Sequence, residues 1–348
     1  MKANAPNLLD IDGDACHHIH NIVKDFSSKI DQESYLQKLL GDIHRDFTFS
    51  ADLRDELGHI AGLLNLPALL PTEFIGHRWL SLFDSSTRFI DIVGQLTIFY
   101  FAWLPISEKH KFANVVTDIM KKCNISTANR ALVYSILRQL KEKSLTNFGK
   151  ARKARIVQKL FQTRQQTLLL SHVFKAVLPM FKEFVLIFEQ KSPQVHKLHD
   201  KLLETYRHFL ACYIRPEVLS KEKILTINPA NTDIMLPTRH IYVGGETETV
   251  LKTLNSEQRK IFMENVKKAY SSTSLYMQKK LPLQNSLLIS LSALDPIVRG
   301  HTATFSHLKN LCCICKITVT DELDLALRQY QLSSDIPPAD HNTPLDIW

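Results

Sequence analysis

The stretch from Leu170 to Phe188 constrains the fold more than any other part of the chain, because its apolar residues all fall on one helical face. These residues follow one another at intervals of three or one: Leu170, Val173, Phe174, Val177, Leu178, Phe181, Phe184, Val185 and Phe188. Such spacing is typical of a helix that buries a wide apolar stripe against other helices. Pro179 lies inside the pattern and is expected to kink or divide the helix, since proline supplies no amide hydrogen.

The same kind of apolar spacing returns between residues 195 and 213 and ends before Pro216. Only a short Ser-Pro-Gln break separates the two stretches. We therefore predict that they form an antiparallel helix pair.

Most of the remaining chain also favours helices, and its low content of only 10 glycines is unusual for a protein built from sheets and turns. Further helices are predicted over residues 16–26, 35–43, 51–64, 80–104, 256–280 and 320–330. Strands are predicted where apolar and polar residues alternate, at 311–320 and more briefly at 240–243, and the first 15 residues are expected to form a strand or loop.

This order predicts a mainly α protein in which a large all-helical insertion interrupts a mixed α/β domain. The insertion is expected to cover residues 31–285. Residues 1–30 and 286–348 are then expected to be the remnants of the interrupted domain.

The net charge of +8 is concentrated in one short segment between Arg138 and Arg164, which holds nine basic residues and a single acid. Within it, Arg152, Arg155 and Lys159 share a helical face, and an unneutralised stripe of this kind favours contact with nucleic-acid phosphates. The predicted binding residues of this segment are Lys150, Arg152, Lys153, Arg155 and Lys159. Two alternatives stay open, a merely solvated face and a nuclear import signal at 150–155.

Other polar groups in the sequence are expected not to hold metals. The motif CHHIH at 16–20 has no second pair of ligands elsewhere, and Asp10, Asp12 and Asp14 lack the glycine and the distal glutamate of a calcium loop. His196, His199 and Asp200 are expected on a solvated helical face, and the cysteines at 312–315 in a core strand. The sequence contains no glycine-rich phosphate loop, so we predict no cofactor.

Several classes of protein are disfavoured by the sequence. The first residues lack the apolar region of a secretory signal, and the apolar run at 92–104 is too short for a membrane span. The six cysteines follow no regular spacing, which predicts reduced thiols in an intracellular protein.

Three segments together resemble the hAT superfamily of DNA transposases: ACHHIHN at 15–21, GHRWLSLFD at 76–84 and LSALDPIVRG at 291–300, with a long helical stretch between the last two. The resemblance implies an RNase H-like fold with an all-helical insertion. It also implies that Arg78 and Trp79 correspond to an Arg-Trp pair near the active site, where tryptophan can stack on a displaced base.

The three catalytic acids of that family have no secure counterparts here, and its dimerisation segment is expected to be missing. The resemblance therefore implies a non-catalytic, transposase-derived nuclear protein that binds DNA without sequence specificity. The alternative is a helical scaffold that binds protein partners and no nucleic acid.

Overall fold

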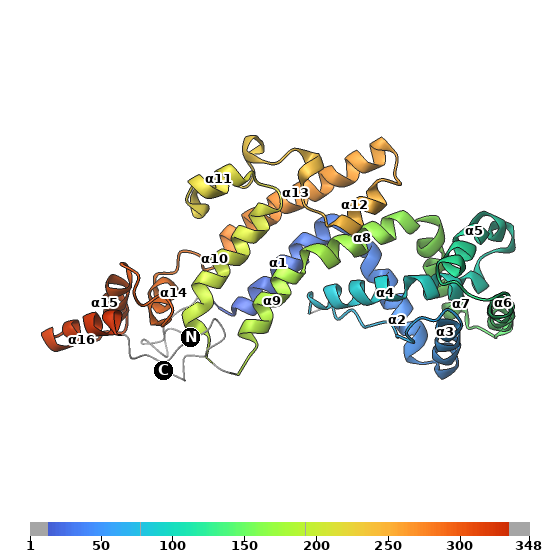
Figure 1. Ribbon diagram of the computed structural model, residues 1–348, viewed down its shortest axis with the longest axis horizontal. Helices are drawn as coiled ribbons and strands as arrows, with labels where there is room; N and C mark the ends of the chain where they lie inside the picture. Colours follow the sequence, from blue (N-terminus) through green and yellow to red (C-terminus); the bar gives the residue numbers. More distant parts are fainter. Residues whose placement is uncertain (1–12, 77, 192, 334–348) are drawn as a thin grey trace. The chain divides into compact units, whose positions relative to one another are not determined.

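The computed structural model describes residues 13–76, 78–191 and 193–333, and within them the chain is helical (Figure 1). No strand forms among these residues, and one isolated antiparallel bridge joins Ile214 and Met235. The prediction of a mainly α protein is confirmed. None of the described helices is both long and apolar enough to span a membrane.

The chain forms sixteen α-helices within the described residues, linked by turns and short 3₁₀ segments. They are α1 (Ala15–Ile30), α2 (Tyr35–Thr48), α3 (Ala51–Leu63), α4 (Ser81–Tyr100), α5 (Ile106–Lys122), α6 (Thr127–Glu142), α7 (Asn147–Val157), α8 (Arg164–Val177), α9 (Pro179–Phe188), α10 (Val195–Ala211), α11 (Pro216–Lys221), α12 (Gly245–Leu251), α13 (Ser256–Lys280), α14 (Ser286–Leu291), α15 (Thr304–Ile314) and α16 (Asp321–Leu332). A π-helical turn (Gln158–Gln162) follows α7.

The helices belong to two compact units, each built from segments that are distant in the sequence. Unit 1 comprises the described parts of Met1–Asp25, Met180–Ile241 and Lys267–Trp348. Unit 2 comprises the described parts of Phe26–Pro179 and Tyr242–Val266.

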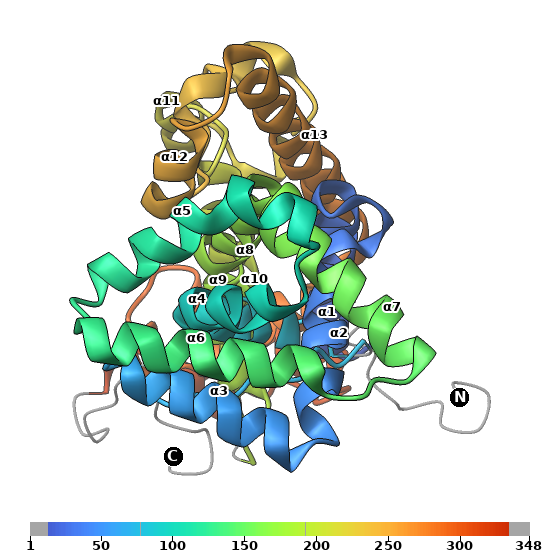
Figure 2. The same ribbon diagram turned by 90° about the vertical axis from the view of Figure 1, so that its right-hand side faces the viewer.

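In unit 2 the apolar helix α4 lies at the centre, and α2, α3, α5, α7 and α8 all contact it. Figure 2 shows α4 nearly end-on with α3, α5, α6 and α7 around it. Its last turn contributes Phe99 and Tyr100 to an aromatic cluster with Phe47 and Trp103, in which ring centroids lie 5.2–6.3 Å apart. This cluster packs against α7, whose Lys153 lies over the Tyr100 and Trp103 rings.

In unit 1 the predicted antiparallel pair is confirmed. Phe181 near the start of α9 contacts Phe209 near the end of α10, with ring centroids 5.5 Å apart. Tyr270 of α13 packs on Phe209 at 5.1 Å and stacks on Tyr213 at 5.6 Å. The expected effect of Pro179 is also confirmed, since α8 ends at Val177 and α9 begins at Pro179.

The predicted strand at 311–320 is wrong. Residues 311–314 belong to α15, in which Leu308 and Cys312 are buried one helical turn apart and Cys313 is exposed. The helix stops at Ile314, and Lys316 adopts a positive φ of 58°. The sequence pattern was misleading because periodicity in a run this short does not distinguish a strand from a helix.

The strand predicted at 240–243 is wrong as well. Ile241 and Val243 are buried and Tyr242 is exposed, as the alternation suggested. However, no neighbouring described strand pairs with this segment, which follows a 3₁₀ turn at Thr238–His240. Extended backbone alone does not make a sheet.

Candidate nucleic-acid interface

The predicted basic stripe lies on α7 and the π-helical turn that follows it. Thr146 caps α7 by accepting a hydrogen bond from the Gly149 amide at 3.1 Å. The helix packs against α2, which carries Asp42 and Asp46 one turn apart. Both carboxylates are buried and point to α7, as their hydrogen bonds show.

Asp46 is the centre of a buried charge cluster. Its carboxylate accepts hydrogen bonds from Arg152 Nε at 2.5 Å, Lys153 Nζ at 2.7 Å and the Tyr100 hydroxyl at 2.9 Å. The Lys153 ammonium also lies 4.2 Å from the centre of the Trp103 ring, a cation–π contact. Burial raises the pKa of Tyr100 well above its usual value, and the charge of Asp46 adds to this effect. The phenol is therefore a permanent donor to Asp46.

A second pair stands one turn along the same interface. Arg155 donates to both oxygens of Asp42, from Nε and from a terminal nitrogen, each at 2.8 Å. This bidentate bond raises the pKa of Arg155. Further along, Lys159 Nζ donates to the Tyr35 carbonyl at 2.5 Å and lies 4.5 Å from the Tyr35 ring centre, and its burial lowers its pKa.

The prediction that this stripe lacks neutralising partners is therefore wrong. Arg152, Arg155 and Lys159 do share one face, but that face meets α2. The acid partners of Arg152 and Arg155 come about one hundred residues earlier in the chain, so a count of charges along the sequence could not pair them. Lys159 donates to a backbone carbonyl of the same region. Lys150 is exposed and forms no ion pair with a described residue, and Lys153 is buried.

Arg78 and Trp79 lie in the turn that leads into α4. The Arg78 amide donates to the Ile75 carbonyl at 2.8 Å, and its side chain is exposed. Trp79 is half-buried and packs edge-on against Phe74 with ring centroids 5.7 Å apart. The tryptophan therefore has a packing role within its own turn.

The structure also groups basic residues that the sequence analysis did not single out. Tyr134, Arg138 and Lys141 are exposed on one face of α6. Lys109 of α5 lies close enough to Lys141 for the two positive charges to repel each other. Burial lowers the pKa of Lys109, and the positive charge of Lys141 lowers it further. We call these four residues the α6 patch. Its three cations make no ion pair with any residue that the structure describes.

A sequence signal for the α6 patch existed. The apolar residues Val133, Ile136, Leu137 and Leu140 follow one another at helical intervals, and Ser126 caps the helix by accepting a hydrogen bond from Asn129 N at 3.1 Å. A helix with that buried side presents the positions 134, 138 and 141 together on one flank, outside the buried side. The proximity of Lys109 could not be read from spacing, since it depends on the packing of α5.

The residues considered as possible metal ligands form hydrogen bonds or are buried within the fold. Asp14 accepts a hydrogen bond from the Cys16 amide at the start of α1, and burial, helped by the charge of Asp14, raises the pKa of the Cys16 thiol to about 11. The expected solvated face at 196–200 is wrong, because His196 and His199 are buried in unit 1. Within the described residues no three His, Cys, Asp or Glu side chains gather as metal ligands would, and Asp10 and Asp12 lie outside them.

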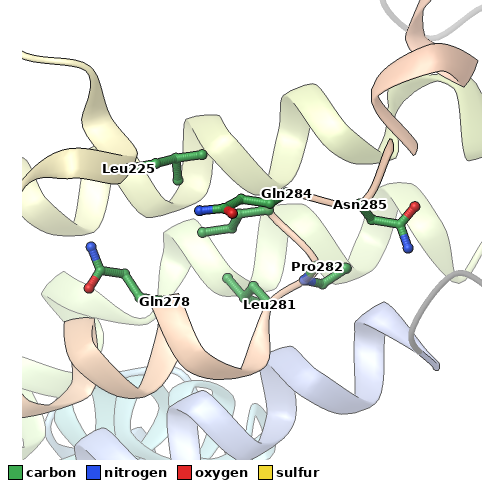
Figure 3. A pocket seen from close by; sticks show the side chains of 7 residues that line it. Leu225, Gln278, Leu281, Pro282, Gln284 and Asn285 are labelled. Carbon is green, nitrogen blue, oxygen red and sulfur yellow. The ribbon is translucent and has the colours of Figure 1, made fainter. Parts of the chain in front are cut away.

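Unit 1 contains a hollow of about 500 Å³ between the end of α13 and the start of α14 (Figure 3). It is lined by leucines, a proline and amides, with no charged side chain. Two of the amides serve the fold: Gln278 donates to the Ile227 carbonyl at 2.9 Å, and Asn285 caps α14. Its chemistry gives no direction for a ligand.

Comparisons of the chain with family models, with curated proteins and with solved structures found no match.

Proposed function

We propose that this chain is a non-catalytic, transposase-derived protein that binds nucleic acid weakly and without sequence specificity through the α6 patch. One observation carries the proposal: Lys109 and Lys141 lie near each other without a described acid partner. Like charges held together destabilise the free protein, and a polyanion relieves the repulsion. The ancestry and a nuclear location rest on the three segments that resemble hAT transposases.

The position of an aromatic residue among the cations favours single strands over duplexes. Tyr134 is 37% exposed and one helical turn before Arg138. Aromatic side chains stack on unpaired bases while neighbouring cations contact the phosphates. Arg138 and Lys141 then supply phosphate contacts along α6, and Lys109 adds one from α5.

The interface excludes Arg152, Arg155 and Lys159 of α7 and the π-helical turn, because these cations already bind groups of the protein. Releasing Arg155 for phosphates would leave Asp42 buried without an ion-pair partner among the described residues, which costs more free energy than an exposed phosphate contact contributes. Releasing Arg152 would remove one of the two cations that pair with Asp46. The α6 patch requires no such exchange. Lys150 can extend the interface because it is exposed and unpaired among described residues.

A helical scaffold for protein partners is the second candidate, and a specific observation favours it. Phe148 at the start of α7 is 88% exposed and Leu132 of α6 is 49% exposed, and both lie in unit 2. Exposed large apolar side chains are frequent in surfaces that bind proteins. This scaffold would bind its partners in a manner largely insensitive to salt.

A salt titration separates the two candidates. Fluorescein-labelled single-stranded and duplex 20-mers are titrated with the full chain, and anisotropy is followed at several salt concentrations. Three phosphate contacts predict a slope of log K against log salt of about −2 for the single strand and about −3 for the duplex. Absence of binding at the lowest salt, or an affinity that salt leaves unchanged, would refute nucleic-acid binding and favour the scaffold.

A further inference from the structure

Unit 2 contains a groove of about 650 Å³ that is separate from the α6 patch and shares no residue with it. It is formed by residues from α5, the π-helical turn, α8 and α13, together with residues near the end of α1. Pockets that hold small organic molecules have volumes of this order, about 300–1,000 Å³, with mostly apolar walls and a few polar groups.

The groove has an apolar wall of aromatic rings. Phe112 and Phe161 pack with their ring centroids 5.5 Å apart, and Phe262 lies in the same lining. Ile261 also lines the groove and is 53% exposed. Phe112 and Phe262 are half-buried, so part of this wall is accessible to an apolar ligand.

Arg164 is the one charged side chain among the described residues that line the groove, and its environment differs from that of Arg152 and Arg155. Its terminal nitrogen Nη1 donates to the Thr97 hydroxyl at 2.8 Å and to the Leu160 carbonyl at 3.4 Å. Burial lowers the pKa of Arg164, and no carboxylate of a described residue acts against this effect. Arg152 and Arg155, by contrast, each have an aspartate partner.

The guanidinium therefore retains donors that no described residue uses. Both of its hydrogen bonds involve Nη1, which leaves Nε and Nη2 without a partner among the described residues. Arginine stays charged at every physiological pH, so a half-buried guanidinium cannot escape its desolvation cost by losing a proton. Two adjacent N–H donors match the two oxygens of a carboxylate in a bidentate bond.

We propose that this groove is a binding site for a small apolar molecule that carries one carboxylate. The carboxylate pairs with Nε and Nη2 of Arg164, and the apolar body lies against Phe112, Phe161 and Phe262. Aliphatic and aromatic monocarboxylates share this chemistry, so the test includes one of each.

The ligand test uses two matched pairs on the full chain. Isothermal titration calorimetry measures the binding of decanoate and of 2-naphthoate, and of their uncharged counterparts decanol and 2-naphthalenemethanol. We expect at least one carboxylate to bind in a saturable manner and at least tenfold more tightly than its alcohol. Equal affinities within both pairs, or no saturable binding by either carboxylate, would overturn the proposal. The tighter of the two acids identifies the shape of the ligand.

Two sets of variants locate the site. Arg164→Gln is expected to reduce carboxylate affinity at least tenfold while the alcohol binds as before. Because Arg164 is half-buried and this variant can disturb folding, a second pair changes Ile261 at the exposed side of the groove. Ile261→Glu and Ile261→Lys lose the same apolar side chain, and only the glutamate repels the ligand. Several-fold weaker carboxylate binding by Ile261→Glu than by Ile261→Lys supports the site, and equal binding by the two contradicts it.

Discussion

At the scale of single residues, several basic side chains of the segment 138–164 form ion pairs inside the protein and do not face solvent alone. Asp46 pairs with two cations, Arg152 and Lys153, whereas Asp46 is the only carboxylate partner of Lys153 among the residues that the structure describes. The side chains of Lys153 and Asp46 are 3% and 2% exposed. Removing Asp46 and removing Lys153 should therefore change the free energy of unfolding by different amounts. Without Lys153, Asp46 still pairs with Arg152, whereas without Asp46 the buried Lys153 has no carboxylate partner among the described residues.

We predict that Asp46→Asn destabilises the protein by about 3–5 kcal/mol, since it leaves Lys153 buried without a counter-charge. Lys153→Met should cost clearly less, because Asp46 keeps Arg152 and the Tyr100 hydroxyl. Urea unfolding followed by tryptophan fluorescence measures both, with Trp103 beside Lys153 as a local probe. Equal losses for the two variants would show that Arg152 does not neutralise Asp46.

His196 is expected to make the protein less stable at acidic pH. It is 1% exposed, and neither ring nitrogen has a hydrogen-bond partner among the described residues. Burial lowers its pKa, Asp295 raises it, and Lys197 lowers it, with a net decrease. The unfolded chain therefore takes up a proton near pH 6.5 before the folded chain does, so stability is lost as the pH falls below about 6.5.

We expect His196→Leu to remove part of this acid-induced loss and to raise stability at pH 7 by about 1 kcal/mol, because it deletes two buried unpaired nitrogens. Thermal unfolding between pH 5 and 7.5 provides the measurement. His208→Leu is the matched control, since His208 is exposed on the same helix. A pH profile that His196→Leu leaves unchanged would contradict the role assigned to this histidine.

At the scale of elements, the sequence predicted helices well where two signals agreed. The capping residue Thr320 and the acids Asp321 and Glu322 after it together predicted the helix at 320–330. It is α16, which begins at Asp321, and Thr320 accepts a hydrogen bond from the Leu323 amide at 3.3 Å. The strand at 311–320 had one signal only, an alternation of apolar and polar residues, and the first residues of this segment belong to α15 instead. Strand pairing depends on a partner far along the chain, and sequence alternation contains no information on whether the partner exists.

One element-scale prediction concerns the start of α12. Gly244 has a φ of +87°, and a Cβ atom there would lie 2.5 Å from the Ala176 side chain of α8. Gly244→Ala should therefore destabilise unit 2 by about 2 kcal/mol or more, from backbone strain and overpacking.

Gly245→Ala is the matched control for this prediction. A Cβ atom at Gly245 meets no other atom within 4 Å, and the residue is the first of α12. We expect its stability in urea unfolding to equal or exceed that of the wild type, since alanine favours a helix over glycine. Equal losses at the two positions would show that α12 does not pack on α8 as described.

At the scale of the whole molecule, the helical character and the excess of positive charge could be predicted from the sequence, but the use of that charge could not. Composition and spacing identified Arg152, Arg155 and Lys159 as one face. Only the folded chain brings Asp42 and Asp46 of α2 to that face. For the same reason, Lys109 and Lys141, 32 residues apart, became a candidate site only through the packing of α5 and α6.

The proposed nucleic-acid binding depends on the cations of the α6 patch and not on the net charge of the protein. The most direct test compares two triple variants that remove the same charge. One combines Lys109→Gln, Arg138→Gln and Lys141→Gln, and the other combines Lys252→Gln, Lys260→Gln and Lys268→Gln, three exposed lysines outside the patch, of which Lys260 pairs with Glu264. Anisotropy with the labelled single strand at low salt measures both. We predict at least tenfold weaker binding and a salt slope smaller in magnitude by about 2 for the patch variant, with less than a threefold change for the control. Equal losses in the two variants, or no loss in either, would contradict the claim.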